Sequence, residues 1–294
     1  MQIPAFAKVN LCLRVLNRRP DNFHELRTIF QTISLHDTLK LTHIPQRSII
    51  LETDSPAIAA GPENLVWQAL EKCRSQWKLT GGVHARLRKC IPVGAGLGGG
   101  SSDAAAAIIG MLRLTKCRIP LESLIELAAS LGSDVPFFLF GGRALGAGRG
   151  EEIYPLPEVA RKCLLLVSPR DLAVSTAEAY GWLSALLTKD DIPTKIYEFC
   201  TLCWSPQETG LPNDFQATVF KRHPRLKAIQ RELLRQGAVE AALAGSGSTV
   251  FGIFRSPAQA RRTARLFPDD HTFCTETLTR EECARARHWR AVAE

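Results

Sequence analysis

The stretch "PVGAGLGGGSSDAAAA", residues 92 to 107, constrains the fold and chemistry of this chain more than any other. Five of its first nine residues are glycines, which allow positive φ angles and can turn successive backbone N–H groups toward one point. Ser101, Ser102 and Asp103 then follow as favourable helix N-cap residues. We expect a helix from about Asp103 to Leu114 whose positive dipole end lies behind the loop, and this arrangement suits a phosphate group.

Two common phosphate-loop patterns fit this stretch poorly. The P-loop pattern G-x-x-x-x-G-K-[ST] is excluded because no lysine follows the glycines. Gly94, Gly96 and Gly99 satisfy G-x-G-x-x-G, although that pattern alone is weak and no clear βαβ unit surrounds it. A dinucleotide-binding oxidoreductase therefore stays as an alternative of a different class.

Length, composition and charge limit the class of protein. The chain has 294 residues, 45% of them hydrophobic, enough for a large core divided between two domains. It has no apolar run of the roughly 20 residues needed to span a bilayer, and no signal-peptide pattern follows Met1, so we expect a cytoplasmic protein without a membrane partner. The net charge of +8 favours an anionic partner. Because that charge is spread along the chain, phosphates of small molecules fit better than nucleic acid, and a basic nucleic-acid-binding module is the third hypothesis.

The cysteines indicate a reducing compartment. There are nine, an odd number, scattered and mostly embedded in apolar stretches. Cys200 and Cys203 form a lone C-x-x-C without a second pair or a nearby histidine. We interpret it as a chance pair within a helical segment and not as a zinc or redox site.

The pattern of elements predicts an α+β fold. Alternating apolar residues from Ala7 to Val15 indicate a strand whose other face carries Lys8 and Asn10 together. Further elements are expected as strands at 26–44, 81–91, 137–142, 163–169 and 249–254, and as helices at 64–77, 120–132 and 226–237, with an irregular middle in the second half. The C-terminal segments 259–267 and 279–294 are typical of amphipathic helices with solvated basic faces. A glycine-, charge- and proline-rich stretch at 148–162 predicts two domains, 1–155 and 156–294.

The whole glycine string resembles the phosphate loop of the GHMP kinases, which include galactokinase, homoserine kinase and mevalonate kinase. "PAFAKVNLCLRV" (4–15) is similar to the first motif of that family and "LAGSGSTVFGIF" (243–254) to its third. The resemblance spans almost the whole chain. It implies a ribosomal-S5-like N-terminal domain that binds ATP, a ferredoxin-like C-terminal domain, and ATP with Mg²⁺ as cofactors.

Four further segments resemble one branch of the family. They are "RPDNFHELRTIFQTISLHDTL" (19–39), "LGSDVPFFLFGGRALGAGRGEEI" (131–153), "VSTAEAY" (174–180) and "NDF" (213–215). This branch phosphorylates the 2-hydroxyl of a methylerythritol linked to cytidine diphosphate, in the non-mevalonate route to isoprenoids. The alternative within the family is a kinase of another small alcohol.

The resemblance also implies roles for individual residues. Asp134 matches the aspartate that takes the hydroxyl proton, and Lys8 the lysine beside it, which would keep Asp134 ionised and stabilise phosphoryl charge. From the local sequence alone, a turn aspartate and a solvated lysine explain the two residues as well. The residues that would bind ATP are Pro92, Val93, Gly94, Ala95, Gly96, Leu97, Gly98, Gly99, Gly100, Ser101 and Ser102. The Mg²⁺ ligands are not assigned, beyond phosphates with Ser101 or Ser102 nearby.

For the acceptor, Phe23 and Tyr180 match the two positions that stack on cytosine, and His24 matches the histidine that reads the edge of the base. The other residues expected at the acceptor are Asn10, Gly245 and Ser246. The branch usually has Gly-Tyr-His where Asn22-Phe23-His24 stands here. Asn22 can adopt the left-handed conformation of the glycine, and Phe23 can still stack, but the tyrosine hydroxyl is lost. We expect a monomer or a weak homodimer.

Overall fold

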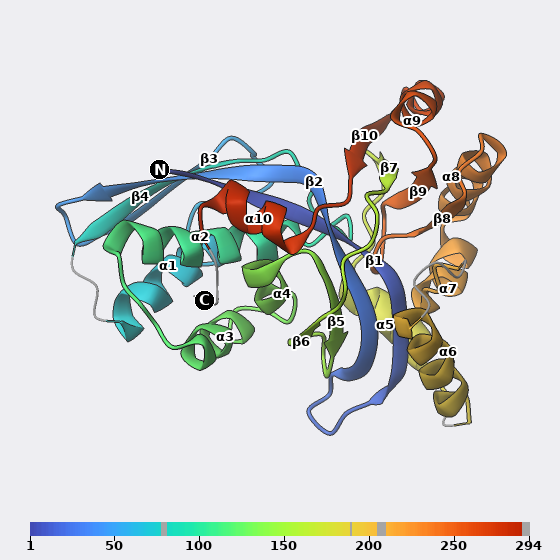
Figure 1. Cartoon of the computed structure of the whole chain (residues 1–294), viewed down its shortest axis with the longest axis horizontal. Helices are drawn as coiled ribbons and strands as arrows, with labels where there is room; N and C mark the ends of the chain where they lie inside the picture. Colours follow the sequence, from blue (N-terminus) through green and yellow to red (C-terminus); the bar gives the residue numbers. More distant parts are fainter. Residues whose placement is uncertain (78–80, 189, 205–209, 290–294) are drawn as a thin grey trace.

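Two β-sheets with helices packed against them form the molecule, which confirms the α+β class (Figure 1). The structure, a computed structural model, describes residues 1–77, 81–188, 190–204 and 210–289. Among these residues, no helix combines the length and the apolar character needed to cross a bilayer.

The first sheet has six strands and is mostly antiparallel. Its strands are β1 Gln2–Arg18, β2 His24–Ile44, β3 Ile49–Thr53, β4 Gly82–Arg88, β5 Arg143–Ala147 and β6 Glu152–Pro155. The order is β3-β4-β2-β5-β6, with β1 paired to β2, and only β3 and β4 run parallel. A dinucleotide-binding fold requires a parallel, doubly wound sheet, so that alternative is wrong.

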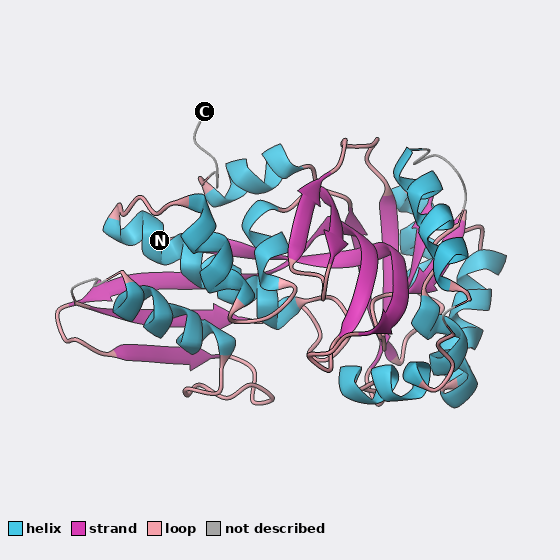
Figure 2. Ribbon diagram, turned by 90° about the horizontal axis from the view of Figure 1, so that it is seen from below, coloured by secondary structure: helices cyan, strands magenta, loops and turns pink. Residues whose placement is uncertain are grey.

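Four helices cover this sheet and enclose its core (Figure 2). They are α1 Leu65–Gln76, α2 Gly99–Thr115, α3 Leu121–Ala129 and α4 Val135–Phe140. The alanine-rich α2 is buried along most of its length and packs on α1, α4, β1 and β2, because its small side chains allow close approach. The N-terminus of α2, where the glycine loop ends, is thereby held between the sheet and α4.

The second half of the chain forms an antiparallel sheet of four strands. In the order β10-β7-β9-β8 these are Asp270–Glu276, Cys163–Pro169, Val250–Phe254 and Glu240–Leu243. Its helices are α5 Thr176–Ser184, α6 Ile192–Trp204, α7 Asp214–Arg222, α8 Pro224–Arg235, α9 Pro257–Ala264 and α10 Arg280–Arg287. A buried cluster containing Ala7 and Val9 of β1 and Leu164 and Leu166 of β7 joins the two sheets.

Several predicted elements are corrected by the structure. Residues 137–142 were expected as a strand, but they contribute to helix α4 and a Gly-Gly corner, because Pro136 favours a helix start and Gly141 ends the helix. Helix α2 begins at Gly99 and not near Asp103. The irregular middle contains helices α6 and α7, and strand β10 was not predicted.

The C-terminal helix α10 returns from the second half of the chain to the first sheet, where it lies beside β1 and α4 (Figure 1). Its basic face was expected to be solvated, and for Arg287 this is wrong, because the residue is 2% exposed. Residues 290–294 of the predicted C-terminal helix lie outside the described residues. The division of the chain near residue 155 stays our proposal, with α10 as a segment that crosses back.

Candidate active site

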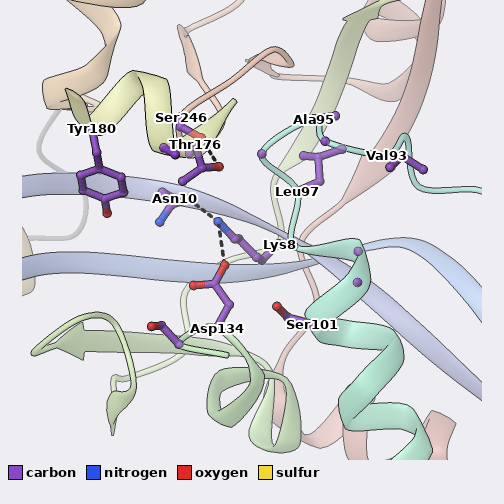
Figure 3. A pocket seen from close by; sticks show the side chains of 18 of the residues that line it. Lys8, Asn10, Val93, Ala95, Leu97, Ser101, Asp134, Thr176, Tyr180 and Ser246 are labelled. Carbon is purple, nitrogen blue, oxygen red and sulfur yellow. Dashed lines mark hydrogen bonds and ion pairs between the residues drawn. The ribbon is translucent and has the colours of Figure 1, made fainter. Parts of the chain in front are cut away.

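A cleft of about 1160 Å³ lies in front of the glycine loop, and both halves of the chain contribute to its wall (Figure 3). Pockets for a single drug-sized ligand have volumes of about 300–1,000 Å³, so this cleft is large for one such ligand. The lining includes every residue predicted for catalysis, ATP binding and acceptor binding except Ser102. Ser102 is buried, and its hydroxyl donates to the carbonyl of Phe6 at 2.6 Å.

Lys8 and Asp134 face each other across the cleft. Lys8 Nζ lies 3.5 Å from Asp134 Oδ2 and donates to Asn10 Oδ1 at 2.8 Å (Figure 3). Asn10 Nδ2 in turn donates to Thr28 Oγ1 at 2.7 Å, and Thr28 is anchored on the carbonyl of Cys12. Irregularities in the β1–β2 register on either side of these residues, after Phe6 and after Asn10, help to aim the two side chains into the cleft. A carboxylate is thus held next to a buried ammonium group whose direction is fixed.

The glycine loop has the conformation that the sequence predicted. Gly94, Gly96 and Gly98 all have positive φ angles, of 67°, 79° and 72°. Gly98 is the N-cap of α2, and no side chain caps the helix there. The first N–H groups of a helix have no partner within it, so here they stay available to an anion at the positive end of the helix dipole. The expected capping roles of Ser101, Ser102 and Asp103 are therefore wrong.

A buried ion cluster stands behind the loop. Lys89 Nζ contacts the carboxylates of Asp103, at 2.7 Å, and of Asp37. Asp37 also accepts from the backbone N–H groups of Cys90 and Ile91, at 2.5 and 2.8 Å. Burial raises the pKa of the Asp103 carboxyl although the Lys89 ammonium opposes this shift. The cluster ties β2 and the segment before the loop to α2.

Aromatic rings gather at the other end of the cleft. His24 stacks on Tyr180 with ring centroids 4.8 Å apart, and Tyr180 meets Phe215 edge-on. Burial, with the charge of Arg18, lowers the pKa of His24 and so favours the neutral ring. Phe23 is 50% exposed. The preceding Asn22 has the left-handed φ of 67° that was predicted for it.

The third motif closes the cleft from the second half of the chain. Ser246 Oγ lies 3.0 Å from Thr176 Oγ1 of α5. The side-chain amide of Asn213 donates to the carbonyls of Leu243 and Gly245, both at 2.8 Å, and so holds this turn. Asn213 belongs to the "NDF" segment, which supports the site through Asn213 and lines the cleft through Phe215.

Sequence reasoning missed many residues of the cleft, among them Arg149, Lys89 and Thr176. Arg149 places its guanidinium 4.8 Å from the centre of the Phe23 ring, and Lys89 and Thr176 also line the wall. Arg149 and Thr176 stand inside segments that were quoted for the family resemblance, "GAGRGEEI" and "VSTAEAY". The position of a cation or a hydroxyl inside such a segment could have predicted both residues as part of the cleft. Lys89 gave none, because its partners are distant in the sequence.

The comparisons with known proteins agree with this geometry. The family described as "GHMP kinases N terminal domain" matches residues 64–142, and "GHMP kinases C terminal" matches residues 197–267. A 4-diphosphocytidyl-2-C-methyl-D-erythritol kinase of Solibacter usitatus is 45% identical, with 99% of this chain and 92% of that protein covered. The enzyme of the same name from Moorella thermoacetica is 39% identical, with 95% and 99% covered.

Solved structures give the same result. The crystal structure of a 4-(cytidine 5'-diphospho)-2C-methyl-D-erythritol kinase superposes with a TM-score of 0.79 at 32% identity, covering 94% of this chain and 99% of the other. A homoserine kinase from Cytophaga hutchinsonii shares the fold, with a TM-score of 0.72 at 15% identity and 95% of each chain covered. The predicted family and fold are thus confirmed. The chain belongs to the GHMP kinase family, within its branch of 4-diphosphocytidyl-2-C-methyl-D-erythritol kinases.

Proposed function

We propose that this chain transfers the γ-phosphoryl group of ATP to the 2-hydroxyl of 4-diphosphocytidyl-2-C-methyl-D-erythritol. The observation that carries the proposal is the placement of Asp134 and Lys8, 3.5 Å apart, in a cleft that also contains an uncapped helix N-terminus and a group of aromatic rings. The helix end suits the phosphates of the donor, and the rings suit the flat base of the acceptor.

The chemistry requires few protein groups, since phosphoryl transfer depends mainly on positioning and on charge stabilisation. Asp134 accepts the proton of the acceptor hydroxyl as the oxygen forms its bond to the γ-phosphorus. The bond between the γ-phosphorus and the bridging oxygen breaks, and ADP leaves. Lys8 stabilises the negative charge on the transferring group, and Asn10 keeps the Lys8 ammonium directed toward it through their 2.8 Å hydrogen bond.

The cleft also fits Mg²⁺ bound together with the nucleotide. Mg²⁺ usually takes one or two protein oxygens together with phosphates and water. Ser101 and Asp134 offer such oxygens on the cleft wall, and the described residues contain no larger cluster of metal-ligating side chains. When bound, Mg²⁺ neutralises charge on the phosphates. We propose Ser101 as its protein ligand, so that Asp134 stays free to act as the base.

The function is tested by ADP release from Mg-ATP with and without 4-diphosphocytidyl-2-C-methyl-D-erythritol, with the product followed by phosphorus NMR. The expected result is acceptor-dependent ADP together with a new phosphomonoester signal. ADP release indifferent to this acceptor, with ATP still bound, would overturn the acceptor and leave the nucleotide site standing. Other small alcohols would then be tested.

Replacing Phe23 by alanine should raise the KM of the cytidyl acceptor about tenfold or more and leave the KM of ATP unchanged. Stacking of an aromatic ring on a base contributes roughly 1–3 kcal/mol, and Phe23 lines the cleft from a turn that is separate from the glycine loop in the sequence. Phe23→Tyr should be tolerated, because the turn at Asn22 already has the left-handed conformation. Steady-state kinetics of the variants measure both constants.

The control for Phe23 is Tyr197→Ala, which removes an aromatic ring that is 71% exposed on α6 and does not line the cleft. It should leave both KM values unchanged. A parallel rise of both constants in Phe23→Ala would contradict a role confined to the acceptor. A large loss of acceptor affinity in Phe23→Tyr would show that Phe23 does not occupy the position that stacks on cytosine.

We propose further that the enzyme works in the cytoplasm on small molecules only, as a monomer or weak homodimer. The nine cysteines are all unpaired, as is usual in a reducing compartment. The cations at the cleft, Lys8, Arg18, Lys89 and Arg149, border a pocket suited to small molecules. Sedimentation at several concentrations measures the oligomeric state.

A further inference from the structure

Arg287, at the end of α10, is a buried cation behind the proposed active site. It is 2% exposed, and among the described residues no carboxylate pairs with it. Its Nη1 donates to the carbonyl of Phe138 at 2.5 Å and its Nε to the carbonyl of Pro4 at 3.2 Å. The guanidinium also lies over the Phe6 ring, 5.3 Å from the ring centre.

A charge buried in this way is costly, because two carbonyls and a ring replace its hydration only in part. Arg287 Nη2 has no hydrogen-bond partner among the described residues. An apolar side chain would fill the same space without that desolvation cost. Arginine is therefore best explained by its planar guanidinium, whose N–H donors bind carbonyl groups of two backbone segments at once.

The first of these segments is α4. The last carbonyl groups of a helix lack partners within it, and a cation near that end binds them favourably. Arg287 does so at Phe138, while the opposite end of the same short helix begins at Asp134, its N-cap. The second segment is β1, where Pro4 and Phe6 precede Lys8 by only a few residues.

The contact continues from α4 into the glycine loop. A Cβ atom placed on Gly98 would lie 2.7 Å from Cζ of Phe138 and 3.2 Å from Cε of Lys8, so the Phe138 ring packs directly against the loop. The other side of α4 is equally tight, because a Cβ on Gly141 would lie 2.9 Å from Sγ of the buried Cys283 in α10. A shift of α4 would therefore move Asp134 and the loop with respect to Lys8.

We propose that Arg287 is a positioning residue for phosphoryl transfer, which fixes α4 to β1 from behind and so sets the spacing between Asp134 and Lys8. The expected effect on kcat rests on the proposed function, whereas the expected effect on the position of α4 does not. The C-terminal helix α10 thereby contributes to the active site indirectly, since none of its residues lines the cleft.

The test compares Arg287→Met, which keeps an unbranched apolar stem, and Arg287→Lys, which keeps the charge with a less extended donor group. The control is Arg285→Met on the same helix, because the Arg285 side chain is 74% exposed and, among the described residues, forms an ion pair with Glu281 alone. In the full-length protein, Arg287→Met should lower kcat at least tenfold and change the KM values of ATP and acceptor less than threefold. Arg287→Lys should recover part of kcat, and Arg285→Met should match the wild type.

Hydrogen exchange of the unliganded proteins gives a readout that is independent of the acceptor. In Arg287→Met, the amides of α4 and of residues 94–100 should exchange at least tenfold faster, while those of the sheet β10-β7-β9-β8 stay as in the wild type. This measurement stands even if the wild-type protein does not phosphorylate the proposed acceptor, so the two proposals can fail separately.

Three results would overturn the proposal. One is a folded Arg287→Met protein with kcat within twofold of the wild type. Another is faster exchange over the whole chain, which would indicate a general loss of stability. If Arg287→Met does not fold, Arg287→Lys decides: wild-type kcat and wild-type exchange in α4 would show that a buried cation is needed for folding alone.

Discussion

Asp134→Asn should lower kcat about 10³-fold while ATP binds with nearly its wild-type affinity. A positioned general base contributes roughly 10²–10⁴-fold to a rate, and 10³-fold corresponds to about 4 kcal/mol of the activation barrier. Asparagine has the shape of aspartate but cannot take the proton of the hydroxyl. ATP should still bind, because the uncapped N-terminus of α2 does not depend on Asp134. Single-turnover rates together with calorimetric titration of ATP measure the two effects separately.

The matched control is Asp171→Asn, which neutralises an aspartate that is 73% exposed and paired with Arg225, outside the cleft. Its kcat should be unchanged. The double variant Lys8→Met/Asp134→Asn should lose little more than the more damaging single variant, because groups that act together in one step are not additive. Near-normal turnover in Asp134→Asn, or fully additive losses in the double variant, would refute the assignment of the base.

The sequence predicted those parts of the site that depend on short local patterns of residues. The positive φ angles of Gly94, Gly96 and Gly98 follow from glycine itself, and that of Asn22 from the tolerance of asparagine for the left-handed region. The strand period puts Lys8 and Asn10 on one side of β1, where the structure joins them by a hydrogen bond. For these residues, the physical cause lies within a few positions of the effect.

The parts that were not predicted depend on contacts distant in the sequence. Arg287 looked like one of several arginines on a basic helix, and only the packing of α10 against α4 and β1 buries it. Asp103 had the composition of a helix cap, yet it pairs with Lys89 inside the protein. The apolar residues 137–140 are compatible with a strand or with a buried helix, and the tertiary contacts of the folded protein decide between the two.

Gly96→Ala should raise the dissociation constant of ATP at least 100-fold, whereas Gly94→Ala should raise it no more than about tenfold. Both glycines have positive φ, so both substitutions carry the left-handed strain of roughly 1–2 kcal/mol. The two positions differ in the free space around the Cα atom. A Cβ at position 94 would meet nothing within 4 Å, while one at position 96 would lie 2.0 Å from the carbonyl oxygen of Ala244.

That carbonyl is backbone and cannot rotate away as a side chain could. Backbone hydrogen bonds also hold the loop, since the Lys8 N–H of β1 donates to the Leu97 carbonyl at 3.0 Å and the Thr249 N–H of the third motif to the Ala95 carbonyl at 3.3 Å. Any movement that relieves Gly96→Ala must therefore displace the loop from β1 or from the third motif. Calorimetric titration of ATP into both variants, with thermal unfolding of each, measures the difference. Equal behaviour of the two variants would mean that ATP binding does not require the close approach of the glycine loop to the third motif.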